Sequence, residues 1–309
     1  MAQTAYHLLI NADSATAHNL GREKIEALVA ESAINLISFD YLPAQSFNDR
    51  LHALIDSPFP LLIGGGDGTI TMAAEMHLHH KKAFGMIPMG TMNLLAADLH
   101  LPGDFAACLN AYKDTTTVDI DVGMINKKPF LCCVSWGTMP EAAKFREKQR
   151  GKWPLLWVPS LLSFVFRQMD KTYRKRINLT LDGHTHTTRT AMLIVSNNLY
   201  SNPSLAAPFR KGTMSDGVLG VYKISPRDFW DKLGLFINLK RGKWHLDPHI
   251  REYQARKVSI NTFKPEDLIS IDGEPVKLKG PYHISLIPRG ISMIIPQEAL
   301  NAHTADAAA

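Results

Sequence analysis

Four glycines and one aspartate occupy positions 64–68, between a short apolar run and a helix-like pattern. Glycine lets backbone N–H groups approach a ligand without an obstructing Cβ, and the N-terminus of the following helix adds positive potential. Both properties suit a phosphate. A carboxylate such as Asp67 repels a bare phosphate, so its presence indicates a metal ion bound with the phosphate. The alternative is a tight strand–helix turn capped by Thr69, but the density of glycine favours the phosphate site.

A second glycine-containing junction follows at 85–93. It places another Gly-Thr pair, Gly90 and Thr91, between an apolar strand and a predicted helix. The carboxyl ends of neighbouring parallel strands face one crevice, so both junctions are expected to line the same site. On its own this junction is equally well explained by Thr91 as a helix cap. In tandem with the first, it favours a nucleotide.

The elements that position these junctions alternate between strand-like and helix-like patterns. Such alternation predicts crossover connections and a parallel sheet covered on both faces. The predicted strands are 6–10, 34–39, 61–63 and 84–87, and the predicted helices are 20–30, 47–55, 69–80 and 93–99. The first part of the chain is therefore expected to form an α/β domain.

After Asp121 the pattern changes to short strands separated by turns. The predicted strands are 130–134, 176–181, 189–195, 217–224, 257–262, 268–271, 282–287 and 291–295, with helical stretches near 140–170 and 226–240. Turn signals at 182–183, 272–273 and 289–290 predict antiparallel hairpins. The predicted fold class is thus an α/β N-terminal domain with a mostly parallel sheet, plus a β-rich, sandwich-like antiparallel C-terminal domain. The predicted boundaries are 1–122 and 123–290, with 291–309 a C-terminal segment that returns to the first domain.

Composition narrows the class of partner. The 309 residues are 45% hydrophobic and 20% charged with a formal net charge of +5, which fits a globular protein with an acidic partner, such as nucleotide phosphates or an anionic membrane. A nucleic-acid function would depend on net charge alone, and we expect none. The three cysteines, two of them adjacent, form neither a disulfide framework nor a metal-ligand pattern. With no signal-like N-terminus, the expected location is cytoplasmic. Nothing in the sequence indicates an oligomeric state.

Several motifs resemble those of the diacylglycerol kinase catalytic domain family, which includes bacterial lipid kinases and sphingosine and ceramide kinases. They are Gly65-Gly66-Asp67-Gly68-Thr69 and Ile87-Pro88-Met89-Gly90-Thr91-Met92-Asn93. The loop Asn11-Ala12-Asp13-Ser14-Ala15 is similar to the family's ATP-contacting Asn-Pro-x-Ser-Gly loop but lacks its proline and glycine. The likeness covers nearly the whole chain in the same order. It implies an ATP- and Mg²⁺-dependent kinase that phosphorylates a lipid hydroxyl, with the nucleotide on the first domain and the lipid on the second.

The resemblance also implies catalytic functions for three acidic residues. Glu274, in Ile271-Asp272-Gly273-Glu274-Pro275, is the expected general base, because phosphoryl transfer needs a carboxylate to accept the hydroxyl proton. Asp67 is expected to hold the magnesium that neutralises the phosphates. Asp121, in Ile120-Asp121-Val122-Gly123, is expected to belong to the same metal network.

The remaining expected ligands also follow from the resemblance. Asp216, in Ser215-Asp216-Gly217-Val218-Leu219, marks a second magnesium site completed by the backbone carbonyls of Thr213 and Val218. Oxygen ligands of this kind suit a hard divalent cation. The expected nucleotide contacts are Asn11, Ser14, Gly65, Gly66, Asp67, Gly68, Thr69, Ile70, Thr71, Gly90, Thr91 and Asn93.

A basic stretch at 144–152 precedes an apolar stretch with two tryptophans at 153–159, and a second basic run follows at 174–176. This combination suits transient contact with an anionic bilayer, at the inner face of the membrane. A solvated helix leading into a core helix explains it as well. Two alternatives to a lipid kinase stay open: an NAD kinase-like enzyme, which shares the glycine-rich loop, and a regulator that binds nucleotide or lipid without turnover. No short motif identifies the lipid, and diacylglycerol and phosphatidylglycerol are both candidates.

Overall fold

The computed structural model describes residues 4–149, 154–173, 175–200 and 211–308. The chain divides into two compact units, each described by itself below. The N-terminal unit comprises 1–121 together with 288–309, and the C-terminal unit comprises 122–287. The boundaries expected from the sequence, after 122 and after 290, lie within three residues of these divisions.

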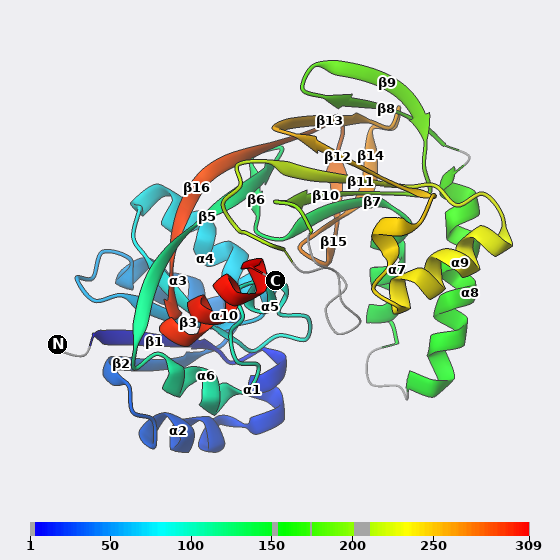
Figure 1. The fold of residues 1–309 in the computed structure, drawn as a ribbon. Helices are drawn as coiled ribbons and strands as arrows, with labels where there is room; N and C mark the ends of the chain where they lie inside the picture. Colours follow the sequence, from blue (N-terminus) through cyan, green and yellow to red (C-terminus); the bar gives the residue numbers. More distant parts are fainter. Residues whose placement is uncertain (1–3, 150–153, 174, 201–210, 309) are drawn as a thin grey trace. The chain divides into compact units, whose positions relative to one another are not determined.

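A parallel sheet forms the centre of the N-terminal unit (Figure 1). Its strands β1 (Ala5–Asn11), β2 (Asn35–Leu42), β3 (Leu61–Gly65) and β4 (Phe84–Pro88) pair in the order β2-β1-β3-β4. Every residue of β3 and β4 is buried, as expected for strands covered on both faces. Helices α3 (Ala44–Leu54) and α4 (Asp67–His80) cover one face, and α2 (Arg22–Ala30) and α6 (Phe105–Ala111) cover the other. The other helices of the unit are α1 (Ala15–Leu20), α5 (Leu94–Asp98) and α10 (Gln297–Ala308).

The buried Tyr112 links the last strand to this sheet, because its hydroxyl also donates to the Ile294 carbonyl at 3.3 Å. Strand β16 (Tyr282–Pro296) pairs in parallel with β4 at Met293 and Ile294. The Tyr112 hydroxyl accepts a hydrogen bond from the Met86 amide at 3.0 Å and donates to the Met86 carbonyl at 2.7 Å. Burial raises the pKa of this phenol well above its ordinary value, so it stays a neutral donor.

Two antiparallel arrangements form the C-terminal unit. Strands β12 (Ile250–Ala255), β11 (Leu219–Ile224), β10 (Met192–Asn197), β7 (Cys133–Gly137), β14 (Glu266–Ile271) and β15 (Glu274–Lys279) make a six-stranded sheet in that order. Strand β16 continues through β13 (Lys257–Asn261) and β8 (Arg176–Leu181) to β9 (His184–Arg189), and β5 (Thr115–Ile125) carries β6 (Lys128–Phe130). Their apolar side chains form one core that includes Phe130, Trp136, Leu193 and Tyr282. The predicted fold class is confirmed.

The helices of the C-terminal unit are α7 (Thr138–Glu147), α8 (Pro154–Tyr173), α9 (Phe229–Lys240) and the short 3₁₀ helix η1 (Trp244–Leu246). Helices α7, α8 and α9 correspond to the helical stretches predicted near 140–170 and 226–240, and η1 lies beyond them. Within the described ranges, no helix combines the length and the apolar character needed to cross a bilayer.

Two of the three predicted hairpin turns are confirmed, at 182–183 between β8 and β9 and at 272–273 between β14 and β15. The turn predicted at 289–290 is wrong, because β16 runs unbroken from Tyr282 to Pro296. Arg289 has a positive φ of 47°, but its amide donates to the carboxylate of Asp121 at 2.8 Å. The hydrogen bond to the buried Asp121 carboxylate stabilises the positive φ of Arg289, so β16 continues instead of forming a turn.

The strand predicted at 130–134 is interrupted, giving β6 and β7 as separate strands. The amides of Leu131, Cys132 and Cys133 turn toward the carboxylate of Asp272 instead of a neighbouring strand. Local sequence does not report this partner, because it lies about 140 positions further along the chain.

Candidate active site

The two glycine junctions of the N-terminal unit lie in direct contact. The amide of Met89, after β4, donates to the carbonyl of Gly65, at the end of β3, at 2.9 Å. A Cβ added to Gly90 would lie 2.7 Å from the Cα of Gly66, closer than side-chain carbons approach in real structures. Glycine is therefore required here because two backbones pack against each other.

Asp67 and Asn93 hold these two loops together. The Asp67 carboxylate accepts a hydrogen bond from the Leu94 amide, the first of α5, at 2.8 Å. The Asn93 side chain accepts from the Gly90 amide at 2.7 Å and donates to the Gly90 carbonyl at 3.0 Å. Asn93 also occupies the N-cap position of α5, so Thr91 is not the cap of this helix. Thr91 itself is exposed beside the loop.

Asn11, at the end of β1, connects a third segment to the same place. Its side-chain amide donates to the hydroxyl of Thr69 at 3.0 Å, while its carbonyl oxygen accepts from the Asp13 amide at 3.0 Å. Thr69 is therefore not the cap of α4. That position belongs to Gly66, and no side chain of the described residues caps it. The N–H groups of Gly68 and Thr69, in the first turn of this 14-residue helix, have no partner within the helix, so they can donate to an anion.

Ser14 is a further sign of a ligand at this edge of the sheet. Its side chain is 7% exposed, yet its hydroxyl has no hydrogen-bond partner among the residues that the structure describes. Buried hydroxyl groups are normally satisfied, and an unsatisfied one costs about 1–3 kcal/mol. The next segment is tied to the glycine loops, because the Thr16 amide donates to the Met89 carbonyl at 2.9 Å. An acceptor or donor on a nucleotide would complete this site.

A magnesium ion shared with the phosphates of a nucleotide would fit beside Asp67. No group of three or more histidine, cysteine, aspartate or glutamate side chains suited to a metal occurs in the described ranges. Mg²⁺ is commonly held by one or two carboxylates together with substrate phosphates. Asp67, half-buried beside the uncapped amides of α4, is the residue that would share such an ion.

The remaining expected nucleotide contacts lie on α4. Gly68 is exposed in the first turn, Ile70 is fully buried, and Thr71 is half-buried one position further. The amide of Ile70 donates to the Gly66 carbonyl at 3.1 Å, so it closes the first turn of the helix. The Ile70 side chain thus anchors the helix in the core, whereas Gly68 lies at the surface.

Asp121 is completely buried at the end of the N-terminal unit. Its carboxylate accepts the Arg289 amide, which fixes the course of β16. This position gives Asp121 a clear structural function. Its expected part in a metal network stays a prediction.

Glu274 lies in the C-terminal unit, at the first position of β15. Its side chain is exposed, and in the described part of the chain its carboxylate forms no hydrogen bond or ion pair. The turn before it is held by Asp272, which has a φ of 47° and is 5% exposed. The Asp272 carboxylate accepts from the amides of Leu131 at 2.8 Å, Cys132 at 2.8 Å and Cys133 at 3.0 Å. A well-fixed turn therefore presents an accessible carboxylate, as a general base requires.

Sequence reasoning missed the structural importance of Asp272 and of Lys211. The Asp272-Gly273 pair predicts only a turn. Lys211 is 2% exposed, and its ammonium group donates to the carbonyls of Leu131 and Cys132 at 3.4 and 3.3 Å. Asp272 and Lys211 thus bind the same short segment, Asp272 through its amides and Lys211 through its carbonyls. No local sequence pattern indicates that a lysine is buried. The Asp-Gly pair directly before the expected base, in contrast, could have indicated the importance of Asp272.

The expected second magnesium site is a loop organised by Asn198. The Asn198 side-chain oxygen accepts from the backbone amide of Asp216 at 3.0 Å. The backbone amide of Asn198 donates to the Val218 carbonyl at 3.1 Å. The carboxylate of Asp216 is on an exposed residue. A carbonyl oxygen has two lone pairs, so Val218 retains one for a cation. Thr213 contributes its hydroxyl to the loop by accepting the Ser215 amide at 3.0 Å.

Part of the predicted membrane-contact segment, 150–153 and 174, lies outside the described residues. Within them, α7 and α8 are joined by the stacked rings of Phe145 and Phe164, whose centroids are 4.8 Å apart. This contact gives the pair of helices an apolar interface of its own.

Comparison with known proteins identifies two domains in the chain. The family profile for the Diacylglycerol kinase catalytic domain matches residues 5–125, and that for the YegS C-terminal NAD kinase beta sandwich-like domain matches 154–295. The chain therefore contains a diacylglycerol kinase catalytic domain followed by a YegS-type C-terminal domain. A solved structure of a putative diacylglycerol kinase from Bacillus anthracis has the same fold, with a TM-score of 0.71 and 17% identity over 96% of both chains.

Curated relatives match over shorter ranges. The uncharacterized protein sll0036 of Synechocystis is 20% identical over 77% of this chain and 55% of its own length. A diacylglycerol kinase of Staphylococcus carnosus is 32% identical over 27% of this chain and 28% of its own length. A diacylglycerol kinase of Staphylococcus epidermidis is 25% identical over 40% of this chain and 42% of its own length. These matches therefore span about half or less of each relative.

Proposed function

We propose that this protein is a lipid kinase that transfers the γ-phosphoryl group of ATP, bound with Mg²⁺, to a hydroxyl of a lipid. The observation that carries the proposal is the pair of interlocked glycine loops beside the uncapped N-terminus of α4, with the Asp67 carboxylate among backbone amides. Amides of this kind bind phosphates, and a carboxylate among them suits a phosphate-bound cation.

In this proposal the N-terminal unit binds the nucleotide. The first amides of α4 donate to phosphate oxygens, Ser14 supplies its unpartnered hydroxyl, and Asp67 shares the metal ion. When bound, Mg²⁺ neutralises negative charge on the transferred phosphoryl group. The hydrogen bonds of Asn11 and Asn93 keep the loops in place, so little reorganisation is needed on binding.

Glu274 accepts the proton of the lipid hydroxyl while the hydroxyl oxygen attacks the γ-phosphorus of ATP. ADP then leaves with the oxygen that bridged the β- and γ-phosphates. An accessible carboxylate suits this step. Asp272 acts through Glu274 as a positioning residue, because its three backbone hydrogen bonds fix the turn. The substrate that we propose is diacylglycerol, phosphatidylglycerol or a related lipid, met in transient contact with the inner face of an anionic membrane.

The decisive test is transfer of labelled phosphate from ATP to a panel of acceptors by the purified protein with Mg²⁺. The panel contains diacylglycerol, phosphatidylglycerol, sphingoid lipids and NAD. We expect a labelled lipid, identified by mass, and its loss in Glu274→Gln with nucleotide affinity retained. Glu266→Gln, which changes an exposed glutamate at the other end of the same hairpin, is the matched control.

Other results would select the alternatives. Labelled NAD would indicate an NAD kinase-like enzyme, an option consistent with the name of the C-terminal profile. Tight ATP binding without any labelled product, unchanged by Glu274→Gln, would indicate a regulator.

A further inference from the structure

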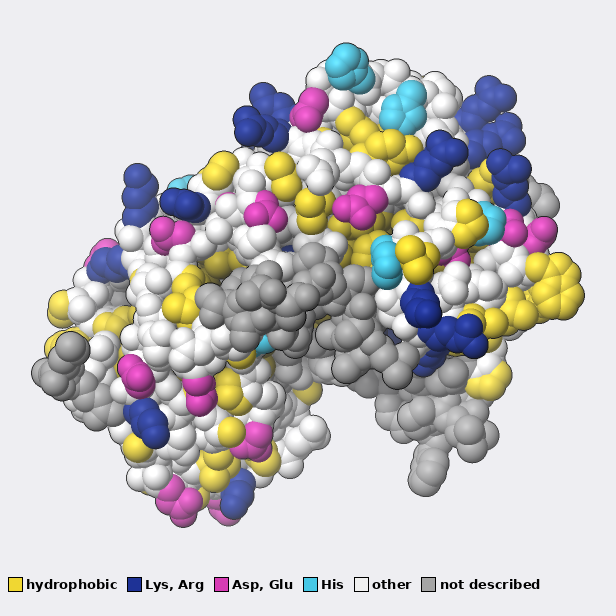
Figure 2. Space-filling view, viewed as in Figure 1, with side chains coloured by type: hydrophobic (Ala, Val, Ile, Leu, Met, Phe, Trp, Pro, Cys, Tyr) yellow, Lys and Arg dark blue, Asp and Glu magenta, His cyan; other side chains and the backbone are white. Residues whose placement is uncertain are grey.

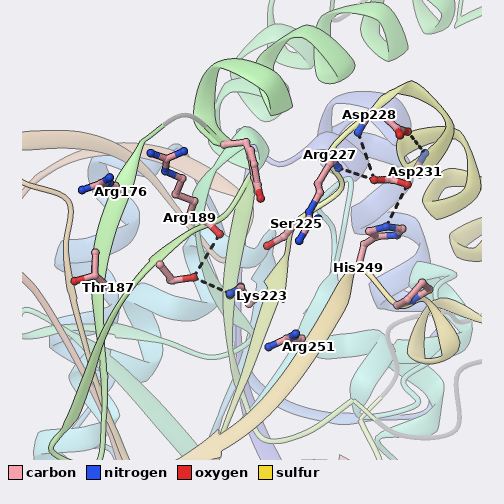
Figure 3. Close-up of a pocket in the computed structure, with 13 residues that line it drawn as sticks. Arg176, Thr187, Arg189, Lys223, Ser225, Arg227, Asp228, Asp231, His249 and Arg251 are labelled. Atoms are coloured by element: carbon pink, nitrogen blue, oxygen red, sulfur yellow. Dashed lines mark hydrogen bonds and ion pairs between the residues drawn. The ribbon is translucent and has the colours of Figure 1, made fainter.

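A pocket of about 830 Å³ opens within the C-terminal unit, and no residue expected to bind nucleotide or metal lines it. Its walls come from the β8–β9 hairpin, the end of β11, the start of α9 and the segment leading into β12 (Figure 3). Five of its lining side chains are cationic: Arg176, Arg189, Lys223, Arg227 and Arg251. Cationic side chains from the β8–β9 hairpin, β11, the segment before α9 and β12 therefore meet at one pocket.

Most of these cations have no acidic partner. In the described part of the chain, the guanidinium groups of the four arginines form no hydrogen bond and no ion pair within 4.0 Å, and Figure 3 draws no dashed line to the guanidinium groups of Arg176, Arg189 and Arg251. The ammonium group of Lys223 donates to a neutral partner, the hydroxyl of Thr188, at 2.7 Å. Burial and the nearby charge of Arg251 lower the pKa of Lys223. An anion in the pocket would reverse this mutual repulsion.

The two aspartates at the pocket are occupied elsewhere. Asp231 accepts from the amides of Arg227 at 2.8 Å and Asp228 at 3.3 Å, and lies 3.2 Å from a ring nitrogen of His249. Asp228 in turn accepts from the Asp231 amide at 2.9 Å, which completes a capping box at the start of α9. These carboxylates satisfy the helix terminus, and Asp231 also attracts the charge of Arg227. Arg176, Arg189 and Arg251 remain without a carboxylate partner in the described part of the chain.

Exposed aromatic side chains follow directly on the same helix. Phe229 is 56% exposed and Trp230 is 74% exposed, and both stand between the pocket residues Asp228 and Asp231. Phe236 and Ile237, two turns further along α9, are also exposed. The spacing gives the helix an apolar surface stripe, and Figure 2 shows hydrophobic side chains over α9 with lysine and arginine side chains nearby. Tryptophan beside cations is typical of a membrane interface.

We propose that this pocket binds the phosphate group of an anionic phospholipid, while Phe229 and Trp230 insert into the bilayer beside it. Planar guanidinium groups match phosphate oxygens, which explains the arginines. A soluble phosphate ester would use the arginines equally, but it would leave the apolar stripe without a function. The inference extends the proposed lipid-kinase function, since it supplies the surface by which the enzyme reaches its substrate.

Co-sedimentation of the full chain with vesicles, without nucleotide, tests the proposal. We expect binding to vesicles that contain phosphatidylglycerol, weak binding to phosphatidylcholine alone, and a decrease with salt. The double variant Arg189→Ala/Arg251→Ala should lower the affinity about 30-fold, which corresponds to about 1 kcal/mol for each basic residue near an anionic surface. Trp230→Ala should also weaken binding, even at low salt. The matched controls are Lys128→Ala/Lys279→Ala, which removes the same charge from exposed residues outside the pocket, and Ile287→Ala, which removes an exposed apolar side chain.

Equal binding of the double arginine variant and the double lysine variant would overturn the proposal. So would retention of the protein on neutral vesicles alone. Binding of inorganic phosphate or glycerol phosphate to the pocket, without retention of the protein on phosphatidylglycerol vesicles, would indicate a soluble ligand. That result would overturn the proposal of a lipid ligand. Because no phosphoryl transfer is measured, a failure of docking and a failure of the kinase proposal are separate results.

Discussion

Replacing Asp272 by asparagine tests whether one buried carboxylate holds the turn before Glu274. Asparagine tolerates the positive φ of 47° at this position, so the backbone itself is not strained. Its single oxygen can still accept from two amides, but its NH₂ group then faces the third. Hydrogen bonds to a charged group contribute about 1.5–3 kcal/mol each and neutral ones about 1 kcal/mol. We therefore expect a loss of about 3 kcal/mol in the free energy of unfolding.

A matched control exists in the same unit. Asp182 occupies the Asp-Gly turn between β8 and β9, has a φ of 45°, and accepts from the amides of Arg256 and Lys257, but it is exposed. In Asp182→Asn one side-chain oxygen can still accept both hydrogen bonds, and water can solvate the exposed NH₂ group. The free energy of unfolding should therefore fall by less than about 1 kcal/mol.

Urea unfolding followed by tryptophan fluorescence is the suitable assay, because all five tryptophans lie in the C-terminal unit. Asp272→Asn should move the midpoint to a clearly lower urea concentration than Asp182→Asn does. Under turnover conditions kcat should fall while the affinity for ATP is retained, as expected of a residue that acts through Glu274. Equal midpoints for the two variants would refute the assignment of the turn to Asp272.

Three further outcomes are expected in the N-terminal unit. Ser14→Ala should leave the apo protein as stable or slightly more stable, because a buried unpartnered hydroxyl is removed, yet reduce the thermal shift produced by MgATP; a stability loss without ATP would contradict this. Gly90→Ala should weaken ATP binding at least about tenfold by forcing Gly90 and Gly66 apart, whereas Gly103→Ala, with open space around it, should not. Burial lowers the pKa of His77 to about 4, so the unfolded chain takes up a proton first below pH 6.5. Stability should thus fall by up to about 3 kcal/mol between pH 6.5 and 4, with a shallower slope in His77→Leu measured by chemical denaturation at each pH.

The sequence was sufficient for features whose cause is local. Glycine density after a buried strand predicted the β3–α4 loop, and Asp-Gly pairs predicted the turns at 182–183 and 272–273. The contact between the two glycine loops followed from the geometry of parallel strands.

Features that depend on a distant partner were not predictable. The pair Arg289-Gly290 has the composition of a turn, but Asp121 captures its amide and the strand continues. Asp272 interrupts a strand-like run about 140 residues earlier in the chain, and the buried Lys211 is recognisable only from the carbonyls around it. The cationic pocket likewise gathers arginines from four elements that no sequence window contains together.

The central claim is that Asp67 lies among phosphate-binding amides because a divalent ion accompanies the nucleotide. Calorimetric titration with ATP, in Mg²⁺ and in EDTA, measures this directly on the native protein, on Asp67→Asn and on the surface control Glu23→Gln. We expect binding that depends on Mg²⁺ in the native protein and the control, and at least about tenfold weaker binding in Asp67→Asn. Equal affinity with and without Mg²⁺, unaffected by Asp67→Asn, would contradict the account.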